Sequence, residues 1–148
     1  MKKLSLKFAL LGAVFIAASH AWAHSDMYFD SHASPHGGQM RMAGPYHLEL
    51  VAGASDVTVY VTSHTNKEIS TAGGEGKAVV KSESGETTIM LSEAGTNMLK
   101  GKGDFTLGPT STVVIFVKLR EQEAQGATFT PLKPMMPSDH HEHHEHHE

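Results

Sequence analysis

The amino-acid sequence predicts an all-β fold, an antiparallel immunoglobulin-like β-sandwich of about seven strands. Two observations support this prediction. Apolar residues recur at every second position over several short runs, and Gly, Ser, Asn, Glu or Pro segments separate these runs. No window carries a long apolar stripe with a helical period, so the sequence favours strands over packed helices.

The strands are expected one after another from residue 46. Residues 46–50 alternate apolar with polar side chains, and residues 57–61 place valine at every second position. Ala54-Ser55-Asp56 between them has the chemistry of a hairpin turn. The remaining strands are predicted at residues 76–82, 87–91, 98–102, 111–119 and 127–132.

The alternation also predicts which side chains face the core. At about 1.5–3 kcal/mol for each fully buried large apolar side chain, the predicted set stabilises one modest domain, so folding does not require a metal ion. The fourteen expected core residues are Leu48, Leu50, Val57, Val59, Val61, Val79, Ile89, Leu91, Leu99, Phe105, Val113, Ile115, Val117 and Phe129.

The N-terminus has the order of features of a secretory signal peptide. Three lysines precede an apolar run at residues 8–18, and the small-residue site Ala21-Trp22-Ala23 follows it. The apolar run is about 11 residues long, shorter than the roughly 20 that cross a bilayer. We therefore expect cleavage after Ala23, with Ala21 as the alternative, and export to the periplasm of a chain without a membrane span.

This cleavage site and the composition divide the chain into four segments. Residues 1–23 form the signal peptide, and residues 24–45, rich in Ser, Gly, Pro, His and Met, form an arm. Residues 46–132 form the β-sandwich domain. Residues 133–148 combine prolines with a charged repetitive run, and we expect this tail to be disordered.

Composition excludes several classes of chemistry. The chain has no cysteine, which removes disulfides, thiolate zinc sites, iron–sulfur clusters, blue-copper centres and cysteine nucleophiles. Loss of the three signal-peptide lysines changes the formal net charge from −4 to −7, and an acidic chain without a basic patch is a poor candidate for nucleic-acid binding. Hydrolase, zinc-protease and phosphate-loop motifs are absent from the sequence, so we predict that the protein is not an enzyme.

The C-terminal run repeats His-His-Glu three times. Imidazole binds zinc, copper and nickel ions, and carboxylates add negative charge, so a run of this density indicates metal affinity whatever its conformation. A pH-sensitive segment and a plain solvated end are the alternatives. The expected ligands are His140, His141, His143, His144, His146 and His147.

Further ligands are expected at the start of the exported chain. After cleavage, His24 would offer its free amine and its ring Nδ1 to one copper ion, unless histidine follows the cleavage site by chance. His32, His36 and Met40 follow in the arm, and His47 lies on the first predicted strand. Imidazoles suit Cu(II) and Zn(II), whereas thioethers select Cu(I), so the mixture suits a protein that handles copper in both states.

The sequence pattern gives a less specific position for three residues of this region. Met42 is interpreted as a core residue. His47 is expected to face the solvent, because it alternates with the apolar Tyr46 and Leu48. His64, at the end of the second predicted strand, has an equally ambiguous position, and for both histidines a plain surface residue without a role is favoured over a ligand.

Four segments carry a family resemblance. They are His36-Gly37-Gly38-Gln39, Ala43-Gly44-Pro45-Tyr46-His47-Leu48-Glu49-Leu50-Val51, Val59-Tyr60-Val61-Thr62 and Lys100-Gly101-Lys102-Gly103. Together they resemble a small family of bacterial periplasmic domains associated with heavy-metal, especially copper, resistance and efflux. The resemblance covers residues 36–131 and implies a metal-linked envelope role with an efflux-pump component as a partner. The exported chain also resembles copper-carrying periplasmic β-sandwich proteins, although His24 alone matches their ligands.

These features predict a non-enzymatic periplasmic protein that binds copper or zinc, with nickel as a further candidate, and buffers or delivers the metal in heavy-metal resistance or efflux. The alternative is a protein-interaction module of an envelope assembly whose tail binds metal incidentally. A third and less favoured hypothesis is an oxidative copper enzyme that uses His24 in a two-histidine brace.

Overall fold

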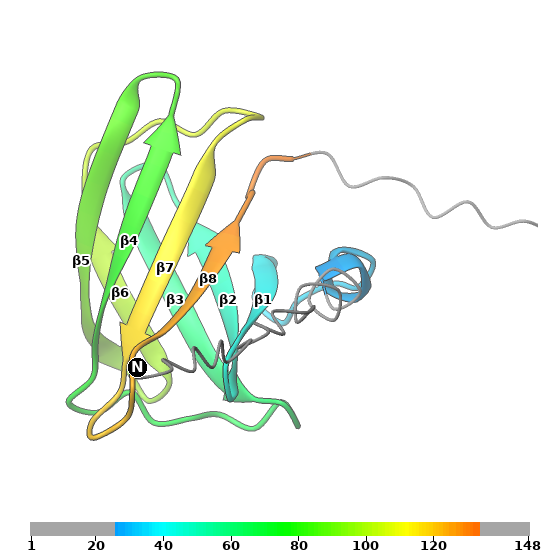
Figure 1. Ribbon diagram of the computed structural model, residues 1–148, viewed down its shortest axis with the longest axis vertical. Coiled ribbons are helices and arrows are strands. Elements are labelled where there is room, and N and C mark those ends of the chain that lie inside the picture. Colours follow the sequence, from blue (N-terminus) through cyan, green and yellow to red (C-terminus); the bar gives the residue numbers. More distant parts are fainter. Residues whose placement is uncertain (1–25, 134–148) are drawn as a thin grey trace, which may run out of the picture.

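The computed structural model of the chain describes residues 26–133, which are drawn in colour in Figure 1. The predicted signal peptide, His24 and the six histidines of the predicted tail lie outside these residues. Eight strands form the framework of the described chain, and a single helical turn at residues 26–30 precedes them. Within this described part, no helix has the length and apolar composition that a membrane span requires.

All neighbouring strands pair antiparallel in one sheet, which confirms the predicted all-β antiparallel class. The order across the sheet is β1-β2-β3-β6-β5-β4-β7-β8. The strands are β1 (Gln39–Ala43), β2 (Tyr46–Ala52), β3 (Asp56–Ser63), β4 (Glu75–Ser82), β5 (Gly85–Gly95), β6 (Met98–Lys102), β7 (Thr112–Lys118) and β8 (Gln125–Phe129).

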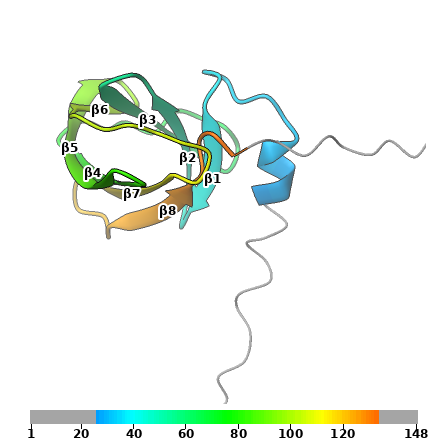
Figure 2. The ribbon, with the colours of Figure 1, turned by 90° about the horizontal axis from the view of Figure 1, so that it is seen from above.

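The sheet curls until its two edge strands, β1 and β8, lie side by side (Figure 2). These edges are joined by side chains, since Oε1 of Gln39 accepts a hydrogen bond from the backbone N–H of Thr130 at 2.7 Å. The prediction of about seven strands in a sandwich is therefore corrected. Eight strands form one nearly closed sheet, and the opposite walls of that sheet enclose the core.

Strand β1 lies in the segment that the sequence assigned to an arm. It pairs with β2 from Gln39 opposite Leu50 to Ala43 opposite Tyr46. Gly44 and Pro45 connect the two strands, and Gly44 has a φ of 55°, which glycine adopts without strain. The sheet thus begins before residue 46 and includes Met40 and Met42 of the predicted arm.

The core lies inside the curled sheet and matches most of the predicted set. Twelve of the fourteen expected side chains are buried, and Phe105 packs against them partly buried. The prediction for Val79 is wrong, because Val80 is 1% exposed and faces the core in its place. Ala78 explains this register: it pairs with Ile89 on one side and Ile115 on the other, so a small side chain lies between two large ones.

Candidate metal centre

The outer face of strands β1, β2 and β3 carries the ligand types that the sequence singled out. Directly paired residues share a face of a sheet, so Met42 lies beside His47 and Met40 lies beside Glu49. Two further histidines lie over this face, from the segments before β1 and after β3. We call this surface the histidine–methionine face; its members are His36, Met40, Met42, His47, Glu49 and His64.

His36 is fixed over the sheet by Glu49. Its Nδ1 lies 2.7 Å from Oε2 of Glu49, and its backbone N–H donates to Oε1 at 2.8 Å. The backbone N–H of Gly38 donates to the same Oε1 at 3.1 Å. The imidazole stacks on the ring of Tyr60, with centroids 3.6 Å apart and an interplanar angle of 1°. The buried carboxylate of Glu49 is therefore satisfied by hydrogen bonds from the segment that it holds down.

His47 is covered, which corrects the expectation that it faces the solvent. Only 9% of the residue is exposed. The edge of the Phe29 ring packs on its imidazole, and His64 stacks on it, both with ring centroids 5.0 Å away. Its Nδ1 lies 3.3 Å from Oδ1 of Asn66. Burial lowers the pKa of His47 below its ordinary 6.5, although the hydrogen bond with Asn66 opposes this change, so folding favours the neutral ring.

A tight turn after β3 brings His64 back over His47. The backbone N–H of Asn66 donates to the backbone oxygen of Ser63 at 2.9 Å. Asn66 has a φ of 59°, a left-handed conformation in which asparagine is enriched. Nε2 of His64 lies 3.0 Å from the backbone oxygen of Gly44, in the turn between β1 and β2. The side chain of His64 remains exposed, so the histidine pair lies where the face meets the solvent.

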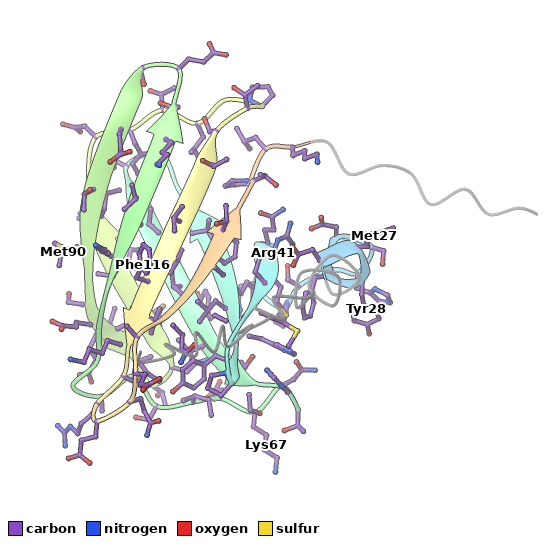
Figure 3. The ribbon with its side chains drawn as sticks, in the orientation of Figure 1. Met27, Tyr28, Arg41, Lys67, Met90 and Phe116 are labelled. Atoms are coloured by element: carbon purple, nitrogen blue, oxygen red, sulfur yellow. The ribbon has the colours of Figure 1, made fainter. Side chains whose placement is uncertain are left out.

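A buried arginine holds the N-terminal helical turn against β1 (Figure 3). Arg41 is 6% exposed, and its guanidinium donates to both carboxylate oxygens of Asp30, at 2.8 and 3.1 Å. The carboxylate of Asp26 lies 3.6 Å from Nε of the same arginine. Two-pronged pairing of this kind is directional. It keeps the helical turn in place, and with it Phe29, which covers His47.

His32 lies on the N-terminal segment, after the helical turn. Its Nδ1 is 2.8 Å from the backbone oxygen of Tyr28, and its ring stacks on that of Tyr28 at 4.2 Å. The residue is exposed. Its contacts therefore belong to the helical turn, and the structure gives it no place on the histidine–methionine face.

Each of the four described histidines uses one ring nitrogen in a local hydrogen bond with an oxygen that can only accept. In a neutral ring, the bonded nitrogen therefore carries the proton, and the other nitrogen has a free lone pair. Hydrogen bonds of this type orient the imidazoles of metal sites and fix their tautomer. The face thus combines preoriented nitrogen ligands with two thioethers.

The predicted ligands do not form one cluster. Among residues 26–133, no three His, Cys, Asp or Glu side chains come together in a way that could hold a metal ion. The structure pairs His47 with His64, and His36 with Glu49. A metal ion bound to this part of the chain would need a methionine sulfur, a water molecule or a ligand from another segment to complete its coordination.

Sequence reasoning missed two side chains of this region, Glu49 and Asn66, which orient imidazoles. It left His64 ambiguous, and the structure pairs this residue with His47. One signal was available for Glu49, because residues two apart on a strand share a face and His47 was already a candidate. The sequence holds no comparable signal for Asn66. It also does not show that His36 and His64 lie over the sheet, since turns outside the strand alternation place them there.

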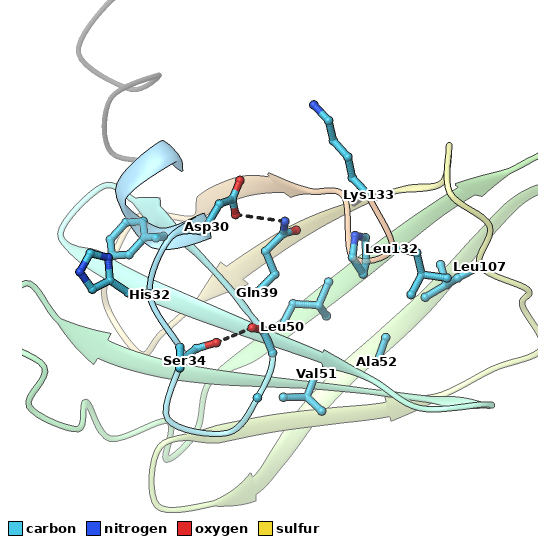
Figure 4. Close-up of a pocket in the computed structure, with 15 residues that line it drawn as sticks. Asp30, His32, Ser34, Gln39, Leu50, Val51, Ala52, Leu107, Leu132 and Lys133 are labelled. Carbon is cyan, nitrogen blue, oxygen red and sulfur yellow. Dashed lines mark hydrogen bonds between the residues drawn. The ribbon is translucent and has the colours of Figure 1, made fainter. Parts of the chain in front are cut away.

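A cavity of about 450 Å³ lies where the N-terminal segment meets the end of β8 (Figure 4). Its lining includes the apolar side chains of Leu50, Leu107 and Leu132. Asp30 and Gln39 are hydrogen-bonded to each other at its rim, with Nε2 of Gln39 donating to Oδ1 at 3.4 Å. Asp30 also accepts a hydrogen bond from Arg41, and Gln39 accepts one from the backbone N–H of Thr130, so both side chains hold the N-terminal segment against the end of β8.

Comparisons of the chain with protein-family models, with curated proteins and with solved structures find no significant match.

Proposed function

We propose that this protein binds copper or zinc ions in the periplasm and buffers them or delivers them to a heavy-metal efflux component. The observation that carries the proposal is the His47–His64 pair. The two rings stack at 5.0 Å, and each has one nitrogen engaged with a fixed oxygen, which leaves the other nitrogen of each neutral ring for a metal ion.

Three further features support this proposal. Met40 and Met42 add thioether sulfur to the same face. The sequence adds six histidines between residues 140 and 147 and a histidine at the expected mature N-terminus. Ligands on an ordered face combined with ligands on terminal segments suit a protein that collects a metal ion and passes it on.

The test is native mass spectrometry of the protein purified from the periplasm and titrated with Cu(I), Cu(II), Zn(II) and Ni(II). A second chain, ending at Pro137, keeps every described residue and removes the histidine repeat. The same spectra report the processed mass and hence the mature N-terminus. We expect both chains to bind copper, with a lower stoichiometry for the shortened one. Absence of metal binding by the full chain would refute the proposal.

A second candidate function is a protein-interaction module of an envelope assembly. It is favoured by two exposed apolar side chains on the outer face of β5 and β7. Met90 is 67% exposed and Phe116 is 40% exposed, and Nζ of Lys77, which lies between them in the register, is 5.0 Å from the Phe116 ring centroid. Exposed apolar side chains with a neighbouring cation suit contact with a partner protein.

Removal of the histidine repeat separates the two candidates in cells. Metal binding and delivery predict that metal tolerance falls in the shortened strain. An interaction module predicts unchanged tolerance, with partner binding retained by the shortened chain and lost on the double substitution Met90→Ser and Phe116→Ser.

A further inference from the structure

We propose that Met42, His47 and His64 form a Cu(I) site in the ordered domain, with two imidazole nitrogens and one thioether sulfur as ligands. This inference rests on the proposed function and deepens it, because it assigns a metal to a particular place on the histidine–methionine face. It also assigns roles to Met42 and His64, which the sequence left as a core residue and an ambiguous one.

The sheet register places the sulfur ligand. Met42 on β1 is the direct partner of His47 on β2, so both side chains leave the sheet on the same face. The Cβ atoms of such partners are about 4.5–5.5 Å apart, within reach of a flexible methionine side chain. Met42 is only partly buried, in contrast to its neighbours Arg41 and Ala43, which are buried on the other face. The side chain of Met42 is therefore not packed into the core, and it lies on the same face as the imidazole of His47.

Nε2 of His47 is the nitrogen available to a metal ion. The hydrogen bond to Asn66 engages Nδ1. Within residues 26–133, no buried side-chain nitrogen or oxygen lacks a hydrogen-bond partner. Because the hydrogen bond described for the His47 ring engages Nδ1, Nε2 is satisfied by solvent contact, although the residue as a whole is 9% exposed. The site is thus sheltered by Phe29 but open to a small ion.

Nδ1 of His64 is the second nitrogen. Nε2 of this residue is held at 3.0 Å by the backbone oxygen of Gly44, which follows Met42 by two residues on the chain. The His64 ring lies nearly parallel to that of His47, at an interplanar angle of 22°. The stacked rings do not yet converge on one point, so binding of one ion requires the exposed His64 ring to give up its hydrogen bond to Gly44 and rotate toward His47.

The donor set selects Cu(I) over the harder ions. Thioether sulfur favours Cu(I), whereas imidazole binds Cu(II) and Zn(II) as well, so the sulfur of Met42 carries the selectivity. The nearest carboxylate of the face belongs to Glu49, and its oxygens already accept three hydrogen bonds from His36 and Gly38. Zinc sites are usually closed by four protein ligands, and no three-residue group of its common ligands exists in the described chain.

The experiment is a titration of the exported chain with Ag(I), an air-stable analogue of Cu(I), and with Cu(I) under reducing conditions, followed residue by residue by NMR. The same titration is run on the chain that ends at Pro137. We expect slow-exchange shifts of the Met42 methyl group and of the His47 and His64 ring nitrogens in both chains. Met42→Leu is expected to weaken Cu(I) binding to the domain by about tenfold or more while Zn(II) binding is unchanged.

Matched controls separate ligation from folding. Met90→Leu changes an exposed methionine elsewhere on the sheet, and His32→Ala changes an exposed histidine outside the face, so both are expected to leave Cu(I) affinity unchanged. Asn66→Gly keeps the left-handed backbone but removes the oxygen that orients His47. Loss of such an orienting group typically costs about 10- to 100-fold in metal affinity.

The outcomes distinguish failure of the Cu(I) site from failure of the proposed metal-binding function. If Ag(I) and Cu(I) shift the tail histidines alone, the site at Met42 does not exist, while metal binding by the protein as a whole stands. If Met42→Leu and Met90→Leu weaken Cu(I) equally, the sulfur assignment is overturned. If neither chain binds any metal, the proposed function fails together with the site.

Discussion

The imidazole of His36 and the carboxylate of Glu49 lie 2.7 Å apart, and they tie the N-terminal segment to the outer face of the sheet. The carboxylate belongs to a central position of β2 and is 3% exposed, whereas the imidazole belongs to the segment before β1. One buried side chain therefore holds the arm at three points, through the ring of His36 and two backbone N–H groups. This relationship gives the first of four predictions.

Glu49→Ala is expected to release the arm. Removing the carboxylate leaves the backbone N–H groups of His36 and Gly38 without their acceptor, which costs about 1–3 kcal/mol for a buried group. Hydrogen exchange at these two amides should accelerate more than exchange in the β4–β5 core. His36→Ala removes one of the three hydrogen bonds and should have a smaller effect. Equal exchange at both amides in the wild type and in Glu49→Ala would contradict this role of the carboxylate.

Asp30→Asn is expected to destabilise the helical turn at residues 26–30. The guanidinium of Arg41 is buried and donates to both oxygens of Asp30, so loss of the charge weakens two charge-assisted hydrogen bonds. Asp30 is partly exposed, and solvent screens the pair, so we expect a loss of about 1–2 kcal/mol in the free energy of unfolding. Chemical denaturation measures this loss. An unchanged midpoint would show that Arg41 is satisfied without Asp30.

Asp26→Asn is not expected to lower the stability of the folded protein at pH 7, in contrast to Asp30→Asn, although Asp26 also lies near Arg41. Burial raises the pKa of Asp26 above its ordinary 3.8, and this effect exceeds the lowering by Arg41. A raised pKa means that the folded state holds the proton more tightly than the unfolded state. The stability from Asp26 is thus full below pH 3.8 and is lost as the pH rises through the folded-state pKa.

The neutral asparagine should therefore leave the protein equally stable or slightly more stable than the wild type at pH 7, and the difference should vanish in acid. The measurement is thermal unfolding of both proteins from below pH 3.8 to pH 7. If Asp26→Asn destabilises the protein at pH 7 as much as Asp30→Asn does, attraction to Arg41 outweighs the burial of Asp26 and the sign is wrong.

Val80→Ala and Val79→Ala test the register of β4. Val80 is 1% exposed and pairs with Val113 across the core face, so its truncation should cost about 2 kcal/mol in the free energy of unfolding. Val79 is half-buried on the outer face, and its truncation should cost less than about 1 kcal/mol. Urea unfolding of the two variants shows which of the two valines faces the core. A larger loss for Val79→Ala would restore the register that the sequence predicted.

The alternation of apolar residues determined most of the strands, because side chains on a strand alternate between two environments. Residues 98–102 form β6 with the predicted bounds, and β2, β3 and β7 differ from prediction at their ends alone. The face of β4 could not be read in the same way. Ala78, Val79 and Val80 are consecutive apolar residues, and the large partners of Ala78, on β5 and β7, decide which of them turn inward.

The sequence did not predict strand β1, because a charged residue of this strand lies on the buried face and its methionines lie on the outer face. Arg41 occupies a buried position on the same face as Leu48, while Met40 and Met42 lie on the outer face. With an arginine at the buried position and methionines on the outer face, the segment lacks the alternation of inward apolar and outward polar residues that predicts a strand. The sequence therefore assigned it to a polar arm. The structure accommodates them because Asp30 neutralises the guanidinium, and the helical turn covers the outer face through Phe29.

By itself, the sequence determined the all-β class and the presence of ligand-type side chains, since these follow from composition and from periodicity along a single strand, while the leader and the tail stay predictions. The tertiary structure decided that the sheet nearly closes on itself and that His64 and Met42 join His47 while His32 remains apart. The physical reason is that the proximity of these side chains depends on register between strands and on the turns at Gly44 and Asn66, and neither leaves a periodic trace in the sequence.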